Sequence, residues 1–274
     1  MQTRALLVLP LLLAALALVD GAAAVGDARI AALQVALRHS GVYRGPVDGA
    51  QSRATTRAVR ALQRRAGLTV DGVAGPVTLR ALGPFARHAP GTRELRLGRS
   101  GMDVAWLQFA LALHGFRIGT IDGGFGLHTD WALRRFQYWA GLHPDGRAGP
   151  GTFAALRRPA PRSPIALRRP VRARLARAFG PHGIGFHYGV AFAVAPGTAV
   201  AAAATGRVAF ARDGAVTLAS AHHVRTLYRG LATTRVRVGQ LVAAGSTLGL
   251  TGRRDFHFEV RVRGAAVDPL RSFR

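Results

Sequence analysis

The chain lacks cysteine and lysine altogether, and it is poor in acidic residues. Its 38 basic side chains are all arginine and face only 13 Asp and Glu, so the formal net charge is +25. Without cysteine, disulfides and thiolate metal sites are excluded, and packing alone must hold the fold together. A field of this sign favours polyanionic partners, namely nucleic acid, anionic lipid or charged cell-wall polymers.

The arginine excess has two interpretations. An arginine-only, alanine-rich composition is typical of high-GC codon usage, which raises the charge without selecting a ligand. The arginines are also scattered through the predicted helices and strands, and no nucleic-acid-binding motif accompanies them. The sequence therefore disfavours nucleic acid, and the charge alone does not choose between anionic lipid and charged cell-wall polymers.

Long apolar runs are absent beyond the N-terminal region. There, Arg4 precedes an apolar run over residues 5–19, and small residues follow at Ala22-Ala23-Ala24. This order is typical of a cleavable signal peptide, which we place at residues 1–24. The alternative is an uncleaved anchor, but the run is shorter than the roughly 20 residues that span a bilayer, and Pro10 interrupts it. We expect a secreted or cell-envelope protein with no integral membrane domain after cleavage.

The first half of the chain repeats itself at a fixed offset. Asp48-Gly49 and Asp122-Gly123 lie 122 − 48 = 74 residues apart. At the same offset, without a gap, Leu33-Gln34 matches Leu107-Gln108, Thr55 matches Thr129, Gln63 matches Gln137, Asp71-Gly72 matches Asp145-Gly146, and Gly75-Pro76 matches Gly149-Pro150. A fixed period of this kind indicates a duplicated module. Duplication of a small module favours binding by avidity over catalysis.

Each repeat predicts three short helices. In the first repeat, apolar residues at helical spacing predict a helix that ends near Gly41, and a second that Thr55 or Thr56 caps and Gly67 ends. Pro76 favours the first position of a third helix ending near Leu82. Gln63 and Gln137 are expected to brace loops. The second repeat has the same plan with heavier side chains, including all three tryptophans.

The shared pattern of the repeats resembles the three-helix peptidoglycan-binding domain of bacterial wall hydrolases. It runs through Leu-Gln, Asp-Gly, Thr, Ala-Val or Ala-Leu, a second Gln, Gly-Leu, a second Asp-Gly and Gly-Pro, over residues 28–84 and 102–158. The marker residues are Asp48, Gly49, Gln63, Asp122, Gly123 and Gln137. The resemblance implies peptidoglycan binding by the modules without assigning it to single residues, because turn and core roles explain the markers equally well. Exposed aromatic rings and amides near the Asp-Gly loops are the expected sugar contacts.

The pattern changes after residue 158. A Pro- and Arg-rich stretch predicts an extended linker over residues 159–170. Short apolar runs bounded by glycine then follow over residues 171–274, for example at 190–194, 206–210 and 256–260. Such runs predict an all-β domain of about 100 residues.

This last segment resembles the zinc endopeptidases of the lysostaphin and LytM type, peptidase family M23. The resemblance rests on His187-Tyr188-Gly189-Val190, on His257-Phe258-Glu259-Val260 and on Val267-Asp268-Pro269-Leu270, in that order. It implies a sheet domain of the duplicated-hybrid-motif type. The predicted fold class is therefore multidomain, α then β, with two small helical modules before an all-β M23-like domain.

The residues that carry the activity of that family are only partly present. The family binds zinc through His-x-x-x-Asp and through the last His of a His-x-His strand. The resemblance thus places metal ligands at His187 and His257, but Ala191 stands where the Asp would be. The two catalytic His positions hold Asp255 and Gly230. A catalytic zinc site needs three protein ligands and a water, so this set is one ligand short.

Two hypotheses follow from these substitutions. In the first, the domain is non-catalytic, no cofactor is bound, and the protein recognises the wall or regulates a partner wall hydrolase, as inactive members of the family do. In the second, it is a divergent zinc endopeptidase that cleaves peptidoglycan cross-bridges. Asp255 would then replace the missing carboxylate, since it lies two residues from His257, with His182 or His222-His223 as further candidates. The substitutions favour the first hypothesis.

Overall fold

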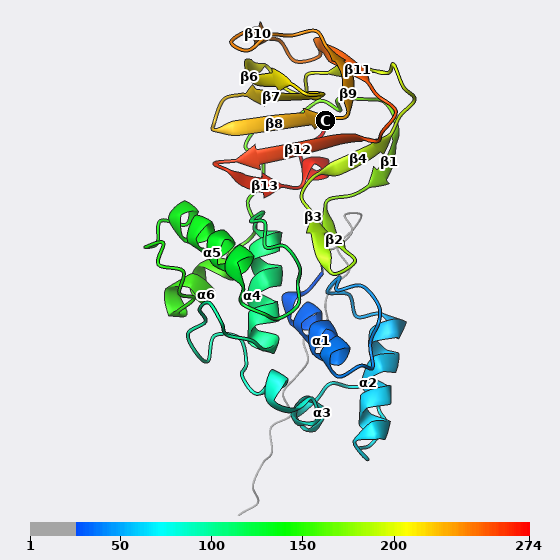
Figure 1. Ribbon diagram of the computed structural model, residues 1–274, viewed down its shortest axis with the longest axis vertical. Coiled ribbons are helices and arrows are strands. Elements are labelled where there is room, and N and C mark those ends of the chain that lie inside the picture. Colours follow the sequence, from blue (N-terminus) through cyan, green and yellow to red (C-terminus); the bar gives the residue numbers. More distant parts are fainter. Residues whose placement is uncertain (1–25) are drawn as a thin grey trace, which may run out of the picture.

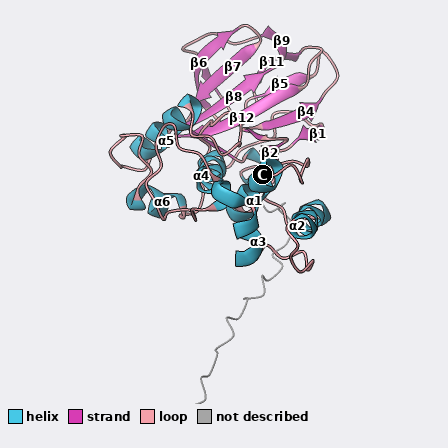
Figure 2. Ribbon diagram, turned by 60° about the horizontal axis from the view of Figure 1, so that its bottom comes forward, coloured by secondary structure: helices cyan, strands magenta, loops and turns pink. Residues whose placement is uncertain are grey.

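The computed structural model describes residues 26–274. The predicted signal peptide, residues 1–24, lies outside them. No helix formed by residues 26–274 is both long and apolar enough to cross a membrane. Helices fill the first half of the described chain and strands the second (Figure 2). The predicted fold class is confirmed.

Each repeat forms three helices, as predicted. Module 1 contains α1 (Ala28–His39), α2 (Arg53–Arg65), α3 (Pro76–Ala81) and the short 3-10 helix η1 (Gly83–Ala86). Module 2 contains α4 (Met102–Leu113), α5 (Leu127–Trp139) and α6 (Pro150–Leu156). Pro76 and Pro150 begin the third helices, where a missing backbone N–H costs nothing.

The cap of α2 differs from the prediction. Ser52, not Thr55 or Thr56, is the N-cap residue, and its hydroxyl accepts a hydrogen bond from the Thr55 backbone N–H at 3.2 Å. Thr55 is fully buried one turn further on, where its hydroxyl contacts the Gln34 side chain. The prediction was wrong because Ser52 and Thr55 are both suitable cap residues and stand only three positions apart. The contact between Thr55 and Gln34, which the sequence does not reveal, places Thr55 inside the helix.

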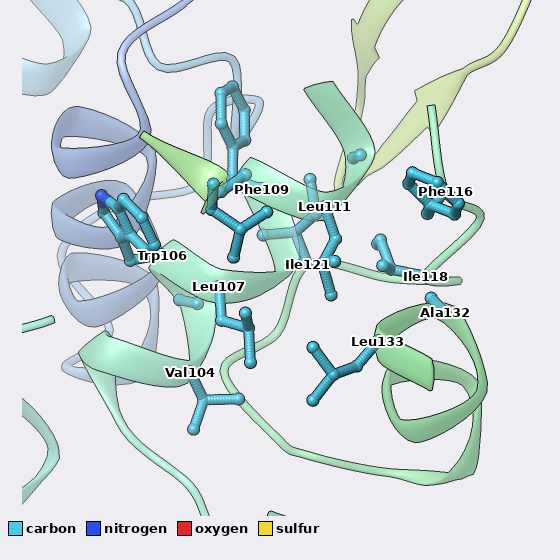
Figure 3. Close-up of a cluster of buried hydrophobic side chains, with 14 of the residues drawn as sticks. Val104, Trp106, Leu107, Phe109, Leu111, Phe116, Ile118, Ile121, Ala132 and Leu133 are labelled. Carbon is cyan, nitrogen blue, oxygen red and sulfur yellow. The ribbon is translucent and has the colours of Figure 1, made fainter. Parts of the chain in front are cut away.

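The two modules meet in a common hydrophobic cluster, and module 1 has a second cluster of its own around Leu37 and Leu62. α1 of module 1 packs along α4 of module 2, and Ala31, Ala32 and Val35 join the cluster around Trp106 and Phe109. Figure 3 shows α4 contributing much of this cluster, with side chains from the 116–121 loop and α5 closing it. Burial of about 25 cal/mol per Å² of apolar surface makes such an interface a major contribution to stability. The repeats are therefore one packed body.

The β domain is built around one large antiparallel sheet. Its strands follow the order β1-β4-β12-β8-β7-β6-β10, with β13 beside β12 (Figure 1). The bounds are β1 (Arg174–Arg177), β4 (Val190–Ala193), β6 (Gly206–Arg212), β7 (Ala215–Ala219), β8 (Val224–Arg229), β10 (Leu241–Val242), β12 (Phe256–Val262) and β13 (Ala265–Val267). A second sheet contains β5 (Ala199–Ala201), β11 (Thr247–Thr251) and β9 (Leu231–Thr234), and β2 (Gly180–His182) and β3 (Gly185–His187) form a hairpin. The 3-10 helix η2 (Pro269–Arg271) follows β13.

The linker is shorter than predicted. Leu167 is buried in the core of the β domain, and its backbone N–H donates to the Ser272 carbonyl at 2.8 Å. Arg168 N–H likewise donates to the Ala203 carbonyl. The second half of the predicted linker is thus part of the β domain. The Pro- and Arg-rich composition had predicted an extended segment there.

Candidate metal site and interdomain contacts

His187 and His257 lie side by side at the heart of the candidate site. His187 ends β3 and His257 is the second residue of β12, and His187 Nε2 lies 3.2 Å from His257 Nδ1. His187 Nδ1 lies 2.8 Å from the Ala178 carbonyl oxygen. A carbonyl can only accept, so Nδ1 carries the proton and Nε2 of His187 presents its lone pair to the site. Partial burial lowers the pKa of His187, and His257 beside it lowers it further. Both effects favour the neutral ring that a metal ligand requires.

The spacing of the two rings fits a shared metal ion as well as a hydrogen bond. Two nitrogens bound to one zinc at about 2.05 Å in tetrahedral geometry stand about 3.3 Å apart. Gly189 permits this close packing, because a Cβ there would lie 2.7 Å from His257 Cε1. The histidine pair therefore supplies two ligands in suitable geometry.

A third ligand is not brought to the pair. Within residues 26–274, no three His, Cys, Asp or Glu side chains are grouped so as to hold a metal ion. Ala191 on β4 pairs directly with His257 on β12 and presents only a methyl group. The described residues thus do not form the three-ligand set that catalytic zinc needs, and we derive no reaction step through a metal.

The structure alters the argument for Asp255. Its presumed position on the His257 face of a strand is wrong, because β12 begins at Phe256 and Asp255 is exposed in the preceding loop. A role of Asp255 as a metal ligand stays a prediction. His222 and His223 lie in the turn before β8, whose first residue pairs with Val262, five residues along β12 from His257. At about 3.3 Å per residue this is roughly 16 Å away.

Gly230 occupies a backbone conformation that other residues avoid. Its φ is +91°, and a Cβ there would lie 2.9 Å from the Asp255 carbonyl oxygen. A histidine at this position, where the resemblance placed a catalytic residue, would be strained.

A buried carboxylate, which the sequence analysis missed, lies behind the histidine pair. Glu259 is fully buried two residues after His257, with Oε2 4.0 Å from His257 Nε2. Arg261 Nε lies 2.7 Å from Oε1, and Arg117 Nη2 of module 2 lies 2.9 Å from Oε2. Burial alone would raise the pKa of Glu259. The contacts with His257, Arg261 and Arg117 outweigh burial and lower the pKa of Glu259 to about 2. An acidic residue inside an apolar strand was the available signal, since charges are rarely buried unpaired.

Tyr188 ties the same region to module 2. Its hydroxyl donates to the Phe116 carbonyl at 2.9 Å and accepts from the Ile118 N–H at 3.3 Å. The Arg117 guanidinium lies 5.0 Å from the Tyr188 ring centre. Tyr188 also belongs to the hydrophobic cluster of the modules. Tyr188, which follows His187, is thus held in place by module 2 as well as by the β domain.

The hairpin that carries His187 is held by both modules. It extends from the β domain toward α1 (Figure 1). At its tip, the Gly183 carbonyl accepts from Val47 N–H at 2.8 Å and the Ile184 carbonyl from Ile121 N–H at 2.7 Å. Val47 and Ile121 are equivalent residues of the two repeats, since 121 − 47 = 74. The duplication therefore supplies two matching donors to adjacent residues of one hairpin.

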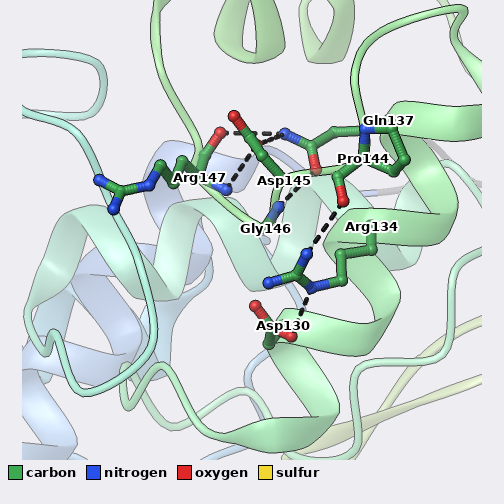
Figure 4. Close-up of polar contacts among 7 residues, drawn as sticks. All are labelled: Asp130, Arg134, Gln137, Pro144, Asp145, Gly146 and Arg147. Carbon is green, nitrogen blue, oxygen red and sulfur yellow. Dashed lines mark hydrogen bonds and ion pairs between the residues drawn. The ribbon is translucent and has the colours of Figure 1, made fainter.

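The marker residues of the modules are loop braces. Gln137 Nε2 donates to Asp145 Oδ1 and the Arg147 carbonyl, while its Oε1 accepts from Gly146 N–H (Figure 4). Gln137 Nε2 also donates to Thr152 Oγ1. Gln63 makes the same contacts with Asp71, Gly72, Val73 and Thr78. Gln34 and Gln108 repeat the arrangement around Asp48-Gly49 and Asp122-Gly123. The predicted bracing role of Gln63 and Gln137 is confirmed. All four amides are buried, so none of them is available to a sugar.

Known protein families match all three parts of the chain. The family described as "Putative peptidoglycan binding domain" matches residues 26–82 and 100–156, and peptidase family M23 matches residues 185–269. The chain carries two peptidoglycan-binding-type modules and one M23 domain. The M23 match includes both His187 and His257, so the histidine pair lies inside the family's domain.

Individual relatives cover only parts of this architecture. The N-acetylmuramoyl-L-alanine amidase CwlM of Mycobacterium tuberculosis is 45% identical over 104 residues, 36% of this chain and 25% of that protein. An uncharacterized protein of Mycobacterium bovis is 32% identical over 233 residues, 69% of this chain and 56% of that protein. A zinc-containing peptidase from Vibrio cholerae has a similar structure at 29% identity and a TM-score of 0.36, over 38% of this chain and 39% of that one. The chain thus spans a quarter to just over half the length of these two sequence relatives.

Proposed function

We propose that this is an exported cell-wall protein that binds peptidoglycan through its modules and carries an M23 domain that does not cut. The observation that carries the proposal is Ala191, which faces His257 across the β4–β12 pair at the place of the missing carboxylate. The positive φ of Gly230 supports it, because a catalytic histidine does not fit there without strain. The site has two metal ligands, and Asp255 and Gly230 stand at the two catalytic His positions of the family. No residue at these positions is thus left to orient a water or to transfer a proton for peptide hydrolysis.

The surface around the histidine pair then serves recognition. The hairpin and Tyr188 fix this surface relative to both modules, so the peptide-binding surface of an M23 domain would be presented at a set position beside a module on the glycan. Wall peptide or a partner wall hydrolase is the ligand that this arrangement would accept.

The test is metal content and wall cleavage by the full-length protein. We expect purified protein to hold well under one zinc per chain and to leave the turbidity of isolated sacculi unchanged, with or without added zinc. Ala191→Asp should raise zinc affinity at least tenfold, because it completes three ligands. Ala193→Asp is the matched control: it adds the same charge two residues along β4, at an exposed position that pairs with Arg174 instead of His257.

The divergent zinc endopeptidase remains a second candidate, and the 3.2 Å spacing of the two imidazoles favours it. Under that proposal, wild-type protein would carry about one zinc, which Asp255→Ala would remove. Cleavage of sacculi by the wild type, abolished by His187→Ala, would overturn the non-catalytic proposal.

A further inference from the structure

A basic cleft lies between module 2 and the end of the β sheet remote from the histidine pair. It has a volume of about 630 Å³. Its charged and titratable lining residues are Arg135 of α5, His222 and His223 of the turn before β8, Arg225 of β8, Arg261 of β12, and Arg263 of the turn after β12. Its lining includes no carboxylate side chain.

The arginines of the cleft have little internal compensation. Among residues 26–274, no ion pair involves Arg135, Arg225 or Arg263, and only Arg261 is paired, to Glu259. Glu259 is already shared with Arg117. Four arginines from separate elements thus line one cleft, and three of them make no ion pair with the described residues, so the cleft keeps a net positive charge.

The walls of the cleft are fixed by the fold. His222 and His223 both adopt left-handed backbone conformations, with φ of 56° and 57°. Arg263 N–H donates to the His223 carbonyl at 3.1 Å, which ties the turn before β8 to the turn after β12. A pre-formed site of this kind binds without first having to order its loops.

An exposed aromatic stripe begins at the edge of the cleft. Trp131 lines a small adjoining recess together with Arg135 and Arg261, and the Arg135 guanidinium lies 4.8 Å from the Trp131 ring centre. Leu127, Trp131 and Tyr138 are 75%, 57% and 78% exposed, and their spacing of four and seven residues puts them on one face of α5. Rings of this kind stack on sugar faces.

We propose that this arginine cleft binds phosphate groups of a phosphodiester-linked polymer attached to the cell wall, with Trp131 as an adjoining platform for a sugar or polyol unit. This rests on the proposed wall-binding function. Guanidinium groups match phosphate oxygens in a bidentate fork. Several guanidiniums in one cleft suit a ligand that carries a charge on every unit. Single-stranded nucleic acid suits it less, since its binding sites stack bases on rows of aromatic rings and the cleft itself contains none besides the two histidines.

The first experiment compares two preparations of wall with the full-length protein. One is intact wall, and the other is wall from which hydrofluoric acid has removed the phosphodiester polymers and left the peptidoglycan. We expect wild-type protein to bind intact wall about tenfold more tightly at low salt. Arg225→Gln/Arg263→Gln should bind intact wall only as well as stripped wall. The matched control is Arg57→Gln/Arg64→Gln, which removes the same charge from exposed residues of α2.

The second experiment uses soluble poly(glycerol phosphate) in a direct titration. The cleft variant should lose about tenfold in affinity and the α2 control less than twofold, because only the cleft arginines contact phosphate. Equal losses in both variants would show that net charge alone acts, and the proposal would fail. A single-stranded DNA of equal charge that binds at least as tightly would assign the cleft to nucleic acid instead.

The two proposals fail in different ways. If wild-type protein binds neither wall preparation, wall binding fails, while the titration with poly(glycerol phosphate) still decides on the cleft. If both walls are bound equally by all variants, wall binding stands and the cleft proposal is overturned.

Discussion

The two modules share a brace and differ in several of their exposed side chains. Each Asp-Gly loop is held by a buried glutamine in the same geometry in both repeats. On the second helix, however, exposed Arg53, Arg57 and Arg64 of module 1 correspond to exposed Leu127, Trp131 and Tyr138 of module 2. After duplication, the glutamine braces were thus retained, while these exposed positions diverged. Only module 2 acquired an aromatic face next to a basic cleft.

The two modules also differ in how they contact the β domain. Arg117 of module 2, which pairs with Glu259 of the β domain, corresponds to Tyr43 of module 1, whose hydroxyl donates to Pro46 of its own loop at 2.8 Å. Module 2 therefore contacts the β domain through a charged side chain as well as through the Ile121 backbone N–H, whereas the hydrogen bond from module 1 to the hairpin is made by the Val47 backbone alone. A second copy has been adapted as a scaffold for another domain.

The largest expected effect comes from removing a brace. Gln108→Ala should lower the free energy of unfolding by about 3 kcal/mol, because the buried loop groups that Gln108 satisfies lose their partner. Gln34→Ala should cost a similar amount in module 1. Because α1 and α4 share a core, both variants should unfold in one transition in urea.

The control for the braces is Gln51→Ala, an exposed glutamine whose loss should change stability by less than about 0.5 kcal/mol. Two separated transitions in Gln34→Ala would show that module 1 folds independently, which would break the shared-core description.

The next effect concerns the ion pair that only module 2 makes. The pKa of Glu259 is lowered to about 2, so its stabilising contribution is complete above about pH 4.5 and is lost as the pH falls through about 2. Wild-type protein should therefore lose about 2 kcal/mol more stability than Glu259→Gln between pH 5 and pH 2. Thermal unfolding at several pH values measures this difference. Glu94→Gln, which removes an exposed pair with Arg147, should retain the wild-type pH profile.

Substitutions on the exposed faces of α2 and α5 should have a smaller effect, which changes wall binding and not stability. Trp131→Ala should weaken retention on sacculi by about fivefold to tenfold, because an aromatic stack contributes about 1 kcal/mol. Arg57→Ala, at the equivalent residue of module 1, should weaken it less than twofold. Both variants should leave the unfolding midpoint unchanged, since both side chains are exposed. Equal losses would mean that both modules bind the glycan through the same helix.

The smallest effect lies at the helix starts. Ser52 caps α2 through its side chain, but the equivalent residue before α5 is Gly126, which has no side-chain cap. Ser52→Ala should cost about 1 kcal/mol, and Gly126→Ser should gain only a few tenths, because glycine is a tolerable N-cap. A Cβ at Gly126 meets no atom within 4 Å, so the gain is free of steric cost. Urea titration of both variants tests the order, and a loss at Gly126→Ser would contradict it.

The sequence predicted the elements of this fold well because their signals are local. The Gln and Asp-Gly pattern and Pro76 lie within one repeat, the 74-residue offset shows the same pattern a second time, and the helices formed where they were expected. The strands of the β domain followed from short apolar runs between glycines. The histidine pair was also predicted, since the resemblance to M23 placed metal ligands at His187 and His257, and the structure brings their ring nitrogens within 3.2 Å of each other.

What the sequence could not predict are contacts between parts of the chain far apart. Tyr188 and Phe116 are 72 residues apart, and Arg117 and Glu259 are 142 residues apart, with no periodicity to connect them. The basic cleft is similarly assembled from one helix and three places in the sheet. Asp255 is a different case: the same-face argument assumed that it lies in a strand that starts one residue later, and its role as a ligand stays a prediction.

The contacts of the β2–β3 hairpin with both modules also predict that the covalent connection between the helical modules and the β domain is dispensable for the fold. Tyr188, Ala265 and Ala266 of the β domain belong to the same cluster as Phe116 and Ile118 of module 2, so cutting the exposed segment near Pro159 would leave this interface intact. Two fragments, 26–160 and 161–274, should therefore complement one another when they are produced together. Protease nicking in that segment would leave a native-sized particle on a sizing column, and the fragments would separate only in denaturant.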